Sequence, residues 1–265
     1  MSQYHLKTDS VGRKRLNLQG KVYNPGSQQF LLDQGLKKGW SVLEVGCGSG
    51  TMTSWLAEQV GKRGRVVCID NSSAQIRATK QVVKKNGLKQ VECHELSVFD
   101  LDQLKEKFDL VYSRFVLIHL DDPLNALIKI KDRLKTGGRL VINDMLNSCS
   151  FCYPGSPVFD QRRKILEQFS IKNGLNPNFS LTLPEILRKI KLKILNESVF
   201  QPLLTTPVNR KLLTLIFYEI KDKLIALNIL TASEWELFMR DLEKIQKDTS
   251  YFVTLSSMHQ ICIGK

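Results

Sequence analysis

The sequence predicts an α/β protein built on a doubly wound, mostly parallel sheet. Between residues 40 and 145, short β-rich runs alternate with longer runs of helical periodicity, the pattern of repeated βαβ units. The first run, VLEVGCGSG from Val42 to Gly50, ends with three glycines in five positions. Glycines at the point where a strand gives way to a helix indicate a ligand-binding turn in this class of fold.

The predicted elements follow the chain in a regular order. Five strands are expected at residues 41–45, 65–70, 90–94, 108–113 and 139–144. The helix after the glycines has an apolar face with a period of three to four residues, formed by Met52, Trp55, Leu56 and Val60. The next helix is expected to begin at Ser72-Ser73 and to end at Asn86-Gly87. A further helix is expected to begin at Asp122-Pro123 and to end at Gly137-Gly138.

Beyond residue 150 helical periods dominate. Helices are expected at 158–172 and 208–227, and capping boxes at Thr182 to Glu185 and Thr231 to Glu234 indicate two further helix starts. Residues 191–199 and 258–264 have the composition of strands. We therefore expect the helices of residues 151–180 and 200–250 to be insertions into one continuous domain, with the last two strands returning to the edge of the sheet.

Composition places the chain among ordinary globular proteins. It has 265 residues, of which 42% are hydrophobic and 25% charged, and no apolar run is long enough to span a bilayer. The first 18 residues carry basic side chains without an apolar segment behind them, so a cytoplasmic location without membrane insertion is expected. In a chain of this size the six cysteines are expected to be reduced thiols.

The net charge of +13 raises the question of a polyanionic partner. Basic residues are spread along the chain, and the densest segment, at residues 188–193, alternates them with apolar ones as a half-exposed segment does. We interpret the charge mainly as a solvated surface, and keep a nucleic-acid partner as the less favoured alternative.

The glycine turn narrows the choice of ligand. A dinucleotide site requires glycine at the sixth position counted from Gly46, where this chain has Thr51. Glu44, on the strand before the turn, is placed to accept a hydrogen bond from a ligand ammonium group. Asp70, at the end of the second strand, is placed to bind the two hydroxyls of a ribose. A ligand with a ribose, an amino group and no pyrophosphate fits these features, and S-adenosylmethionine has that composition.

Four motifs in order, VLEVGCGSG, the acidic end of VVCID, FDLVYSRFVLIHLDDP and LKTGGRLVIND, resemble those of the class I S-adenosylmethionine-dependent methyltransferases. The small-molecule branch, with the ubiquinone and menaquinone C-methyltransferases, is the most similar. The resemblance is strong from Tyr23 to Asp144. It implies a Rossmann-like sheet of seven strands with an antiparallel last strand, a cofactor-binding core in residues 1–150, and a helical substrate lid with the final two strands in residues 151–265.

The resemblance also implies roles for individual residues. The cofactor-binding residues that it indicates are Glu44, Gly46, Cys47, Gly48, Gly50, Asp70, Asn71, Ser97, Val98 and Arg114. Asn71 would lie along the adenine, and Arg114 would line the methionine end through its backbone carbonyl. Ser97 is a departure, because the family usually has an aspartate at this place. Thr136 replaces the proline usual before the glycine pair.

Methyl transfer from a sulfonium depends mainly on positioning, so an acid–base pair is not required. If the acceptor needs a base, His119 is the candidate, and Tyr23 and Asp144 are further candidates at the pocket. Tyr4 and His5 precede the first strand and are weaker pocket candidates. No metal site is expected, because the pair Cys149 and Cys152 lacks further ligands.

The favoured hypothesis is therefore methyl transfer to a small-molecule acceptor that is enclosed by the helical insertions. Methyl transfer to RNA or protein, and a non-catalytic protein that binds S-adenosylmethionine, are the alternatives. The break in the dinucleotide spacing at Thr51 argues against a dehydrogenase. The identity of the acceptor and the oligomeric state are left open by these patterns.

Overall fold

A computed structural model describes residues 10–265, apart from the side chains of Ser10, Val11 and Arg13. Its main sheet has seven strands in the order β3-β2-β1-β4-β5-β9-β7. The strands are β1 (Ser41–Val45), β2 (Arg65–Asp70), β3 (Val91–Glu95), β4 (Phe108–Arg114), β5 (Leu134–Leu146), β7 (Lys193–Phe200) and β9 (Ser257–Gly264). The predicted Rossmann-like sheet is confirmed.

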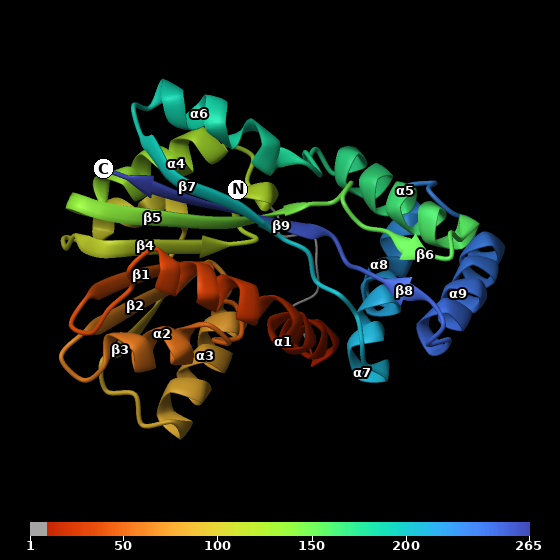
Figure 1. Cartoon of the computed structure of the whole chain (residues 1–265), viewed down its shortest axis with the longest axis horizontal. Coiled ribbons are helices and arrows are strands. Elements are labelled where there is room, and N and C mark those ends of the chain that lie inside the picture. Colours follow the sequence, from red (N-terminus) through yellow and green to blue (C-terminus); the bar gives the residue numbers. More distant parts are fainter. Residues whose placement is uncertain (1–9) are drawn as a thin grey trace.

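The last strand, β9, is antiparallel to both of its neighbours, β5 and β7, whereas the pairs among the first five strands are all parallel. Seven of its eight residues are buried, as expected for a strand covered on both faces. The predicted return of the chain to the sheet after residue 190 is therefore confirmed, and the antiparallel last strand lies inside the sheet with β7 at the edge (Figure 1).

Helices cover both faces of the sheet (Figure 1). One face carries α1 (Ser10–Asp33), α2 (Thr53–Val60) and α3 (Ser73–Lys85), and the other carries α4 (Pro123–Asp132) and α6 (Leu183–Lys189) with the short turns η1 (Val98–Gln103) and η3 (Phe179–Thr182). Leu56 and Val60 of the predicted apolar stripe on α2 are fully buried against β1 and β2. The burial of such faces is the main stabilising contribution to this layer arrangement.

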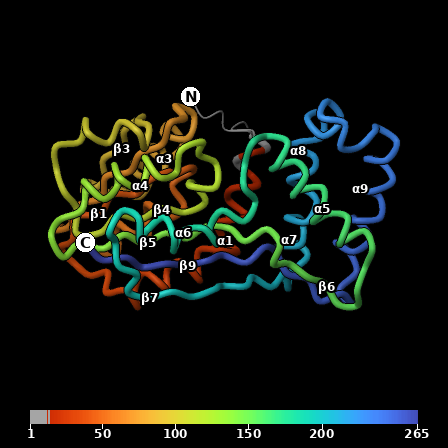
Figure 2. Tube along the Cα trace, turned by 90° about the horizontal axis from the view of Figure 1, so that it is seen from above, coloured from red at the N-terminus to blue at the C-terminus, as the bar shows by residue number. Residues whose placement is uncertain are grey.

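A second group of helices lies beyond the carboxyl ends of the parallel strands (Figure 2). It consists of α5 (Pro157–Lys172), α7 (Pro207–Arg210), α8 (Leu212–Ala226) and α9 (Ala232–Lys247), with a small sheet formed by β6 (Cys152–Tyr153) and β8 (Phe252–Val253). These helices have a hydrophobic cluster of their own, in which Phe217 and Phe238 meet edge to face with ring centroids 4.8 Å apart.

In the described part of the chain, no helix is both long enough and apolar enough to cross a membrane.

Several predicted boundaries differ from the structure. The helix expected to end at Gly137-Gly138 stops at Asp132, and strand β5 already begins at Leu134, which is buried beside Phe108. The capping box at Thr182 is wrong, because the Thr182 hydroxyl donates to the carbonyl of Phe179 and continues the turn before α6.

The other predicted capping box is confirmed, since the side chains of Thr231 and Glu234 bind each other's backbone N–H groups at the start of α9. The helix expected at 208–227 is divided into α7 and α8 at Lys211. Ser72 caps α3 as predicted, by accepting the N–H of Gln75.

Candidate active site

The glycine turn closes the carboxyl end of β1 over the end of β2. The N–H groups of Gly46 and Cys47 both donate to the carbonyl of Ile69, at 2.9 and 3.0 Å. Gly46, Gly48 and Gly50 have φ angles of +73°, +55° and +75°, a region that side-chain-bearing residues rarely adopt. A Cβ on Gly46 would lie 2.3 Å from a methyl group of Val116. All three glycines are therefore favoured by backbone conformation, and Gly46 is required by close packing as well.

Asp70 joins this turn to the end of β2. One carboxylate oxygen accepts the N–H of Gly48 at 3.0 Å, and the other accepts the N–H of Ser72 at 2.9 Å. Burial raises the pKa of Asp70, although these two hydrogen bonds oppose the shift. Asp70 lines the adjoining cavity, and each of its oxygens keeps a second lone pair, so the carboxylate has capacity for two ligand hydroxyls.

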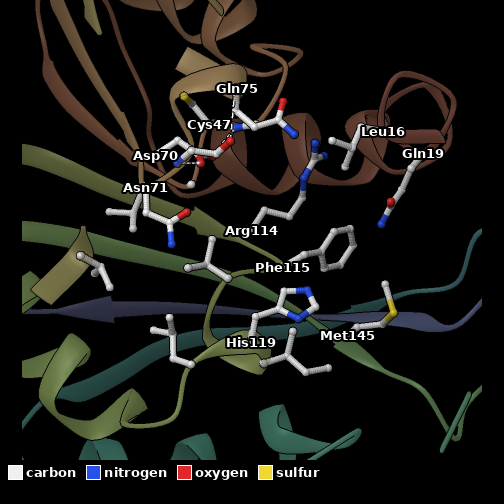
Figure 3. Close-up of a pocket in the computed structure, with 18 of the residues that line it drawn as sticks. Leu16, Gln19, Cys47, Asp70, Asn71, Gln75, Arg114, Phe115, His119 and Met145 are labelled. Atoms are coloured by element: carbon white, nitrogen blue, oxygen red, sulfur yellow. Dashed lines mark hydrogen bonds between the residues drawn. The ribbon is translucent and has the colours of Figure 1, made fainter. Parts of the chain in front are cut away.

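The predicted cofactor-binding residues all line one cavity except Gly50, which lies behind the turn against Thr79. Figure 3 shows Cys47, Asp70, Asn71 and Gln75 on one side of this space. Ser97 and Val98 lie at the start of η1, where the Ser97 hydroxyl accepts the N–H of Phe99 at 3.2 Å.

Glu44 and Arg114 lie on neighbouring strands at the floor of the cavity. Glu44 is only 3% exposed and accepts a hydrogen bond from the hydroxyl of Thr53 at 2.6 Å. Burial raises the pKa of Glu44 to about 7, and the Thr53 bond and the charge of Arg114 oppose that shift. A ligand ammonium group at this place would favour the ionised carboxylate.

Arg114 differs from its predicted backbone role, since its side chain also enters the site (Figure 3). The guanidinium donates to Asn24 at 2.8 Å and to Ser27 at 3.3 Å, both on α1. This contact ties α1 to the end of β4 across the cavity. Phe115, the next residue, has a φ of +54° and packs edge to face on Tyr23 with ring centroids 5.0 Å apart. Strain of this kind in a non-glycine residue often marks a functional site.

The three candidate catalytic residues lie in different settings. His119 lines the cavity at the end of the turn η2 (Leu117–His119) and is labelled among the lining side chains in Figure 3. Tyr23 also lines the cavity, but its hydroxyl donates to the carbonyl of Ser256 at 2.7 Å, and burial raises its pKa well above the usual range.

Asp144 does not line the cavity, in contrast to the expected place at the pocket mouth. It is 1% exposed, and its carboxylate accepts the backbone N–H groups of Ile118 at 3.1 Å and Met145 at 2.9 Å. Burial raises the pKa of Asp144 to about 7. The strand position predicted from sequence is right, but the side chain points under η2 and supports the turn that carries His119.

The cavity has a volume of about 930 Å³ and continues from the glycine turn to the second group of helices. Its far wall is largely apolar and is formed by Leu16, Leu166, Phe169, Leu212, Ile216 and Ile220. Arg15 and Arg162 are charged residues of that wall. Sequence reasoning missed these residues because the helices that carry them meet the site only in the folded chain. It also missed Gln75, Asp100 and Phe115, which line the same cavity.

Two further sequence predictions concern the pair Tyr4 and His5 and the absence of a metal site. Tyr4 and His5 lie outside the described residues. Across residues 10–265, no cluster of three or more histidine, cysteine or acidic side chains could hold a metal ion. Cys149 is exposed and Cys152 is partly buried, and both are free thiols.

Comparison with known proteins decides the family. A family described as a methyltransferase domain matches residues 36–173, just over half of the chain, and this match includes the glycine turn, Asp70 and η2. The chain belongs to this methyltransferase family. The predicted membership of the class I S-adenosylmethionine-dependent methyltransferases is thereby confirmed, and S-adenosylmethionine is the cofactor of that class.

Individual methyltransferases match the same region. An uncharacterised methyltransferase of Schizosaccharomyces pombe is 31% identical over 156 residues, which are 56% of this chain and 55% of that protein. The 2-phytyl-1,4-beta-naphthoquinone methyltransferase of Arabidopsis thaliana is 37% identical over 117 residues, 43% of this chain and 45% of that protein. The chain thus spans about half the length of these curated relatives.

A solved structure shows the same fold. The SAM-dependent methyltransferase from Aquifex aeolicus superimposes with a TM-score of 0.54 at 21% identity, covering 72% of this chain and 91% of that one.

Proposed function

We propose that this methyltransferase transfers the methyl group of S-adenosylmethionine to a small, largely apolar acceptor held between α1, α5 and α8. The observation that carries the proposal is the cavity of about 930 Å³, which continues from the glycine turn to the apolar faces of these helices. That volume is near the upper end of the range for a single ligand, which is about 300–1,000 Å³, so it suits a cofactor with an acceptor beside it. The similarity to a naphthoquinone methyltransferase supports an apolar acceptor.

The residues around the glycine turn fit the cofactor in composition and placement. We assign the ribose hydroxyls to the free lone pairs of Asp70 and the ammonium group to Glu44, with Gly46, Cys47 and Gly48 providing a backbone surface. Asn71, Ser97 and Val98 are assigned to the adenine. The Ser97 hydroxyl accepts a backbone N–H, and it retains one lone pair and its proton for the adenine edge.

The chemistry asked of the protein is mainly positional. When bound, the cofactor would supply a methyl group attached to a positively charged sulfur. Transfer of that methyl group to the acceptor would leave the sulfur as a neutral thioether. The protein holds the acceptor in line and excludes water, which is consistent with the apolar wall.

Of the three candidate catalytic residues, we assign the role of base to His119 for an acceptor that must lose a proton. The hydroxyl of Tyr23 is engaged with Ser256, and its raised pKa disfavours the phenolate. Asp144 acts as a positioning residue, because it binds the backbone of the turn that presents His119.

We propose that α5, α7, α8 and α9 form a lid over the acceptor. In this proposal residues 1–150 form the cofactor-binding core, and residues 151–265 supply the lid and the last two strands of one continuous domain. The contact of Arg114 with α1 and the packing of α1 on α8 join the lid to the sheet.

The test is incubation of the purified protein with methyl-labelled S-adenosylmethionine and a cell extract, followed by separation of small molecules, RNA and protein. Label in the small-molecule fraction is expected. The Asp70→Ala variant serves as the control for background labelling. Label in RNA or protein would refute the small-molecule proposal and give the net charge of +13 a role in substrate docking. Cofactor binding without label in any fraction would favour the non-catalytic alternative.

A further inference from the structure

The wall of the cavity formed by α5 and α8 contains a buried cation whose charge is not paired. Arg162, on α5, is 4% exposed and lines the cavity. Its Nε donates to the carbonyl of Leu213 at 3.2 Å, and its guanidinium carbon lies 5.8 and 5.9 Å from the ring centroids of Phe159 and Phe217. Among the described residues, no carboxylate pairs with Arg162, and no acceptor is hydrogen-bonded to its Nη1 or Nη2.

Two other buried arginines of this region show how such a group is normally satisfied. Arg15, on α1, forms an ion pair of 2.6 Å with the buried carboxylate of Glu219. Arg210, at the end of α7 and away from the cavity, donates to four backbone carbonyls. Buried charges without such partners are rare because desolvation is costly. Arg162 therefore differs from both in having an unused pair of donors.

The surroundings of Arg162 offer little compensation for its charge. Burial lowers the pKa of Arg162 to about 10, which still leaves the guanidinium charged at neutral pH. Tyr23 is the group whose charge would oppose this shift, and its phenol is neutral at physiological pH. Apart from Arg15, which is paired with Glu219, and Ser170, the residues lining this wall are mainly apolar, among them Leu166, Leu212 and Ile216.

We propose that the methyl acceptor is an apolar acid whose carboxylate pairs with Arg162, while its hydrocarbon body packs on α5 and α8. Because Nε is bound to Leu213, the edge formed by Nη1 and Nη2 is the open one, and two parallel N–H donors match the two oxygens of a carboxylate. The proposal rests on the proposed function, since it places the carboxylate in the acceptor part of the same cavity. Arg162 would anchor the acceptor rather than take part in methyl transfer.

The test compares two probes of equal shape, octanoate and octanamide, binding to the protein saturated with S-adenosylhomocysteine. Isothermal titration calorimetry is expected to show octanoate binding at least about tenfold more tightly, because charge-assisted bonds to a desolvated guanidinium are lost with the neutral amide. The Arg162→Gln variant should bind the two probes equally. The Arg162→Lys variant should keep only part of the preference, because lysine retains the charge without the planar pair of donors.

Arg163 provides a matched control on the same helix. Its side chain is 37% exposed and forms an ion pair with Asp160 at 3.3 Å, so Arg163→Gln should leave the preference for octanoate unchanged. Binding of S-adenosylhomocysteine by every variant verifies that the fold is intact. Equal binding of both probes to the wild type, or a preference that survives in Arg162→Gln, would overturn the anion proposal alone. If neither probe binds to the saturated wild-type protein, the small apolar acceptor of the proposed function is refuted as well.

Discussion

Glu44 gives the site a pH dependence that can be calculated. Its carboxyl has a pKa raised to about 7 by burial, and the proposed contact with the cofactor's ammonium group requires the ionised form. Cofactor binding below pH 7 must therefore release a proton, and affinity must rise with pH until the carboxyl is ionised. If only the ionised form binds, the apparent dissociation constant is the intrinsic value divided by the ionised fraction.

With a pKa of about 7, the ionised fraction is about 3% at pH 5.5 and about 76% at pH 7.5. The affinity for S-adenosylhomocysteine should therefore increase about 25-fold over this interval, which corresponds to about 2 kcal/mol. Calorimetry in two buffers of different ionisation enthalpy would measure both the affinity and the released proton.

Two variants separate Glu44 from Asp144, whose pKa is also raised to about 7. Glu44→Gln retains an oxygen for the Thr53 hydroxyl but cannot ionise, so its affinity should be low and nearly independent of pH. Glu58→Gln removes an exposed glutamate from α2 and should leave the wild-type profile unchanged. The reasoning is refuted if the wild-type affinity changes less than about twofold between pH 5.5 and 7.5, or if Glu44→Gln keeps the wild-type slope.

Further predictions concern the turn and the wall of the cavity. Asp70→Ala should weaken S-adenosylhomocysteine binding by roughly 1–3 kcal/mol in calorimetry, and unchanged affinity would contradict its assignment to the ribose. Gly46→Ala should lower the free energy of unfolding in urea by more than Gly48→Ala, because both require a positive φ but only the first places a Cβ 2.3 Å from Val116. Equal losses in these two variants would show that the close contact relaxes. Tyr23→Phe removes a buried hydrogen bond to the loop before β9 and should cost roughly 1–3 kcal/mol of unfolding free energy, while a loss of turnover without a loss of stability would favour a catalytic role.

The parts of the fold that could be predicted are those fixed by local sequence. Strands β1 and β2 have the predicted bounds, because short apolar runs end at glycine or aspartate there. The predicted end of α4 was too late in the chain, because Leu134 fits the apolar pattern of the helix and also that of the strand β5, in which it pairs with Phe108. Only the neighbouring strand decides between the two.

The residues of the candidate site likewise differ in whether local sequence predicts them. Glu44 and Asp70 could be located because strand ends and glycines specify their places along the chain. Arg162 could not be recognised as a site residue from the sequence, because its burial depends on how α5 packs against α8. The two helices are separated by α6 and β7 in sequence. Asp144 was placed on the right strand, but its side chain turns away from the cavity to meet the N–H of Ile118. A contact between elements that are distant in sequence has no local pattern to indicate it.

The position of β9 inside the sheet has a consequence for synthesis of the chain. Strand β5 needs residues 257–264 as its partner on one side, and β7 pairs only with that same strand. Until those residues leave the ribosome, β5 and β7 both present unpaired edges, which favour pairing with other chains. Because helices α7, α8 and α9 lie between β7 and β9 in sequence, they must emerge before the sheet can be completed. Completion of the sheet is therefore a late and long-range folding event, and a nascent chain of this protein should depend on chaperones at that stage.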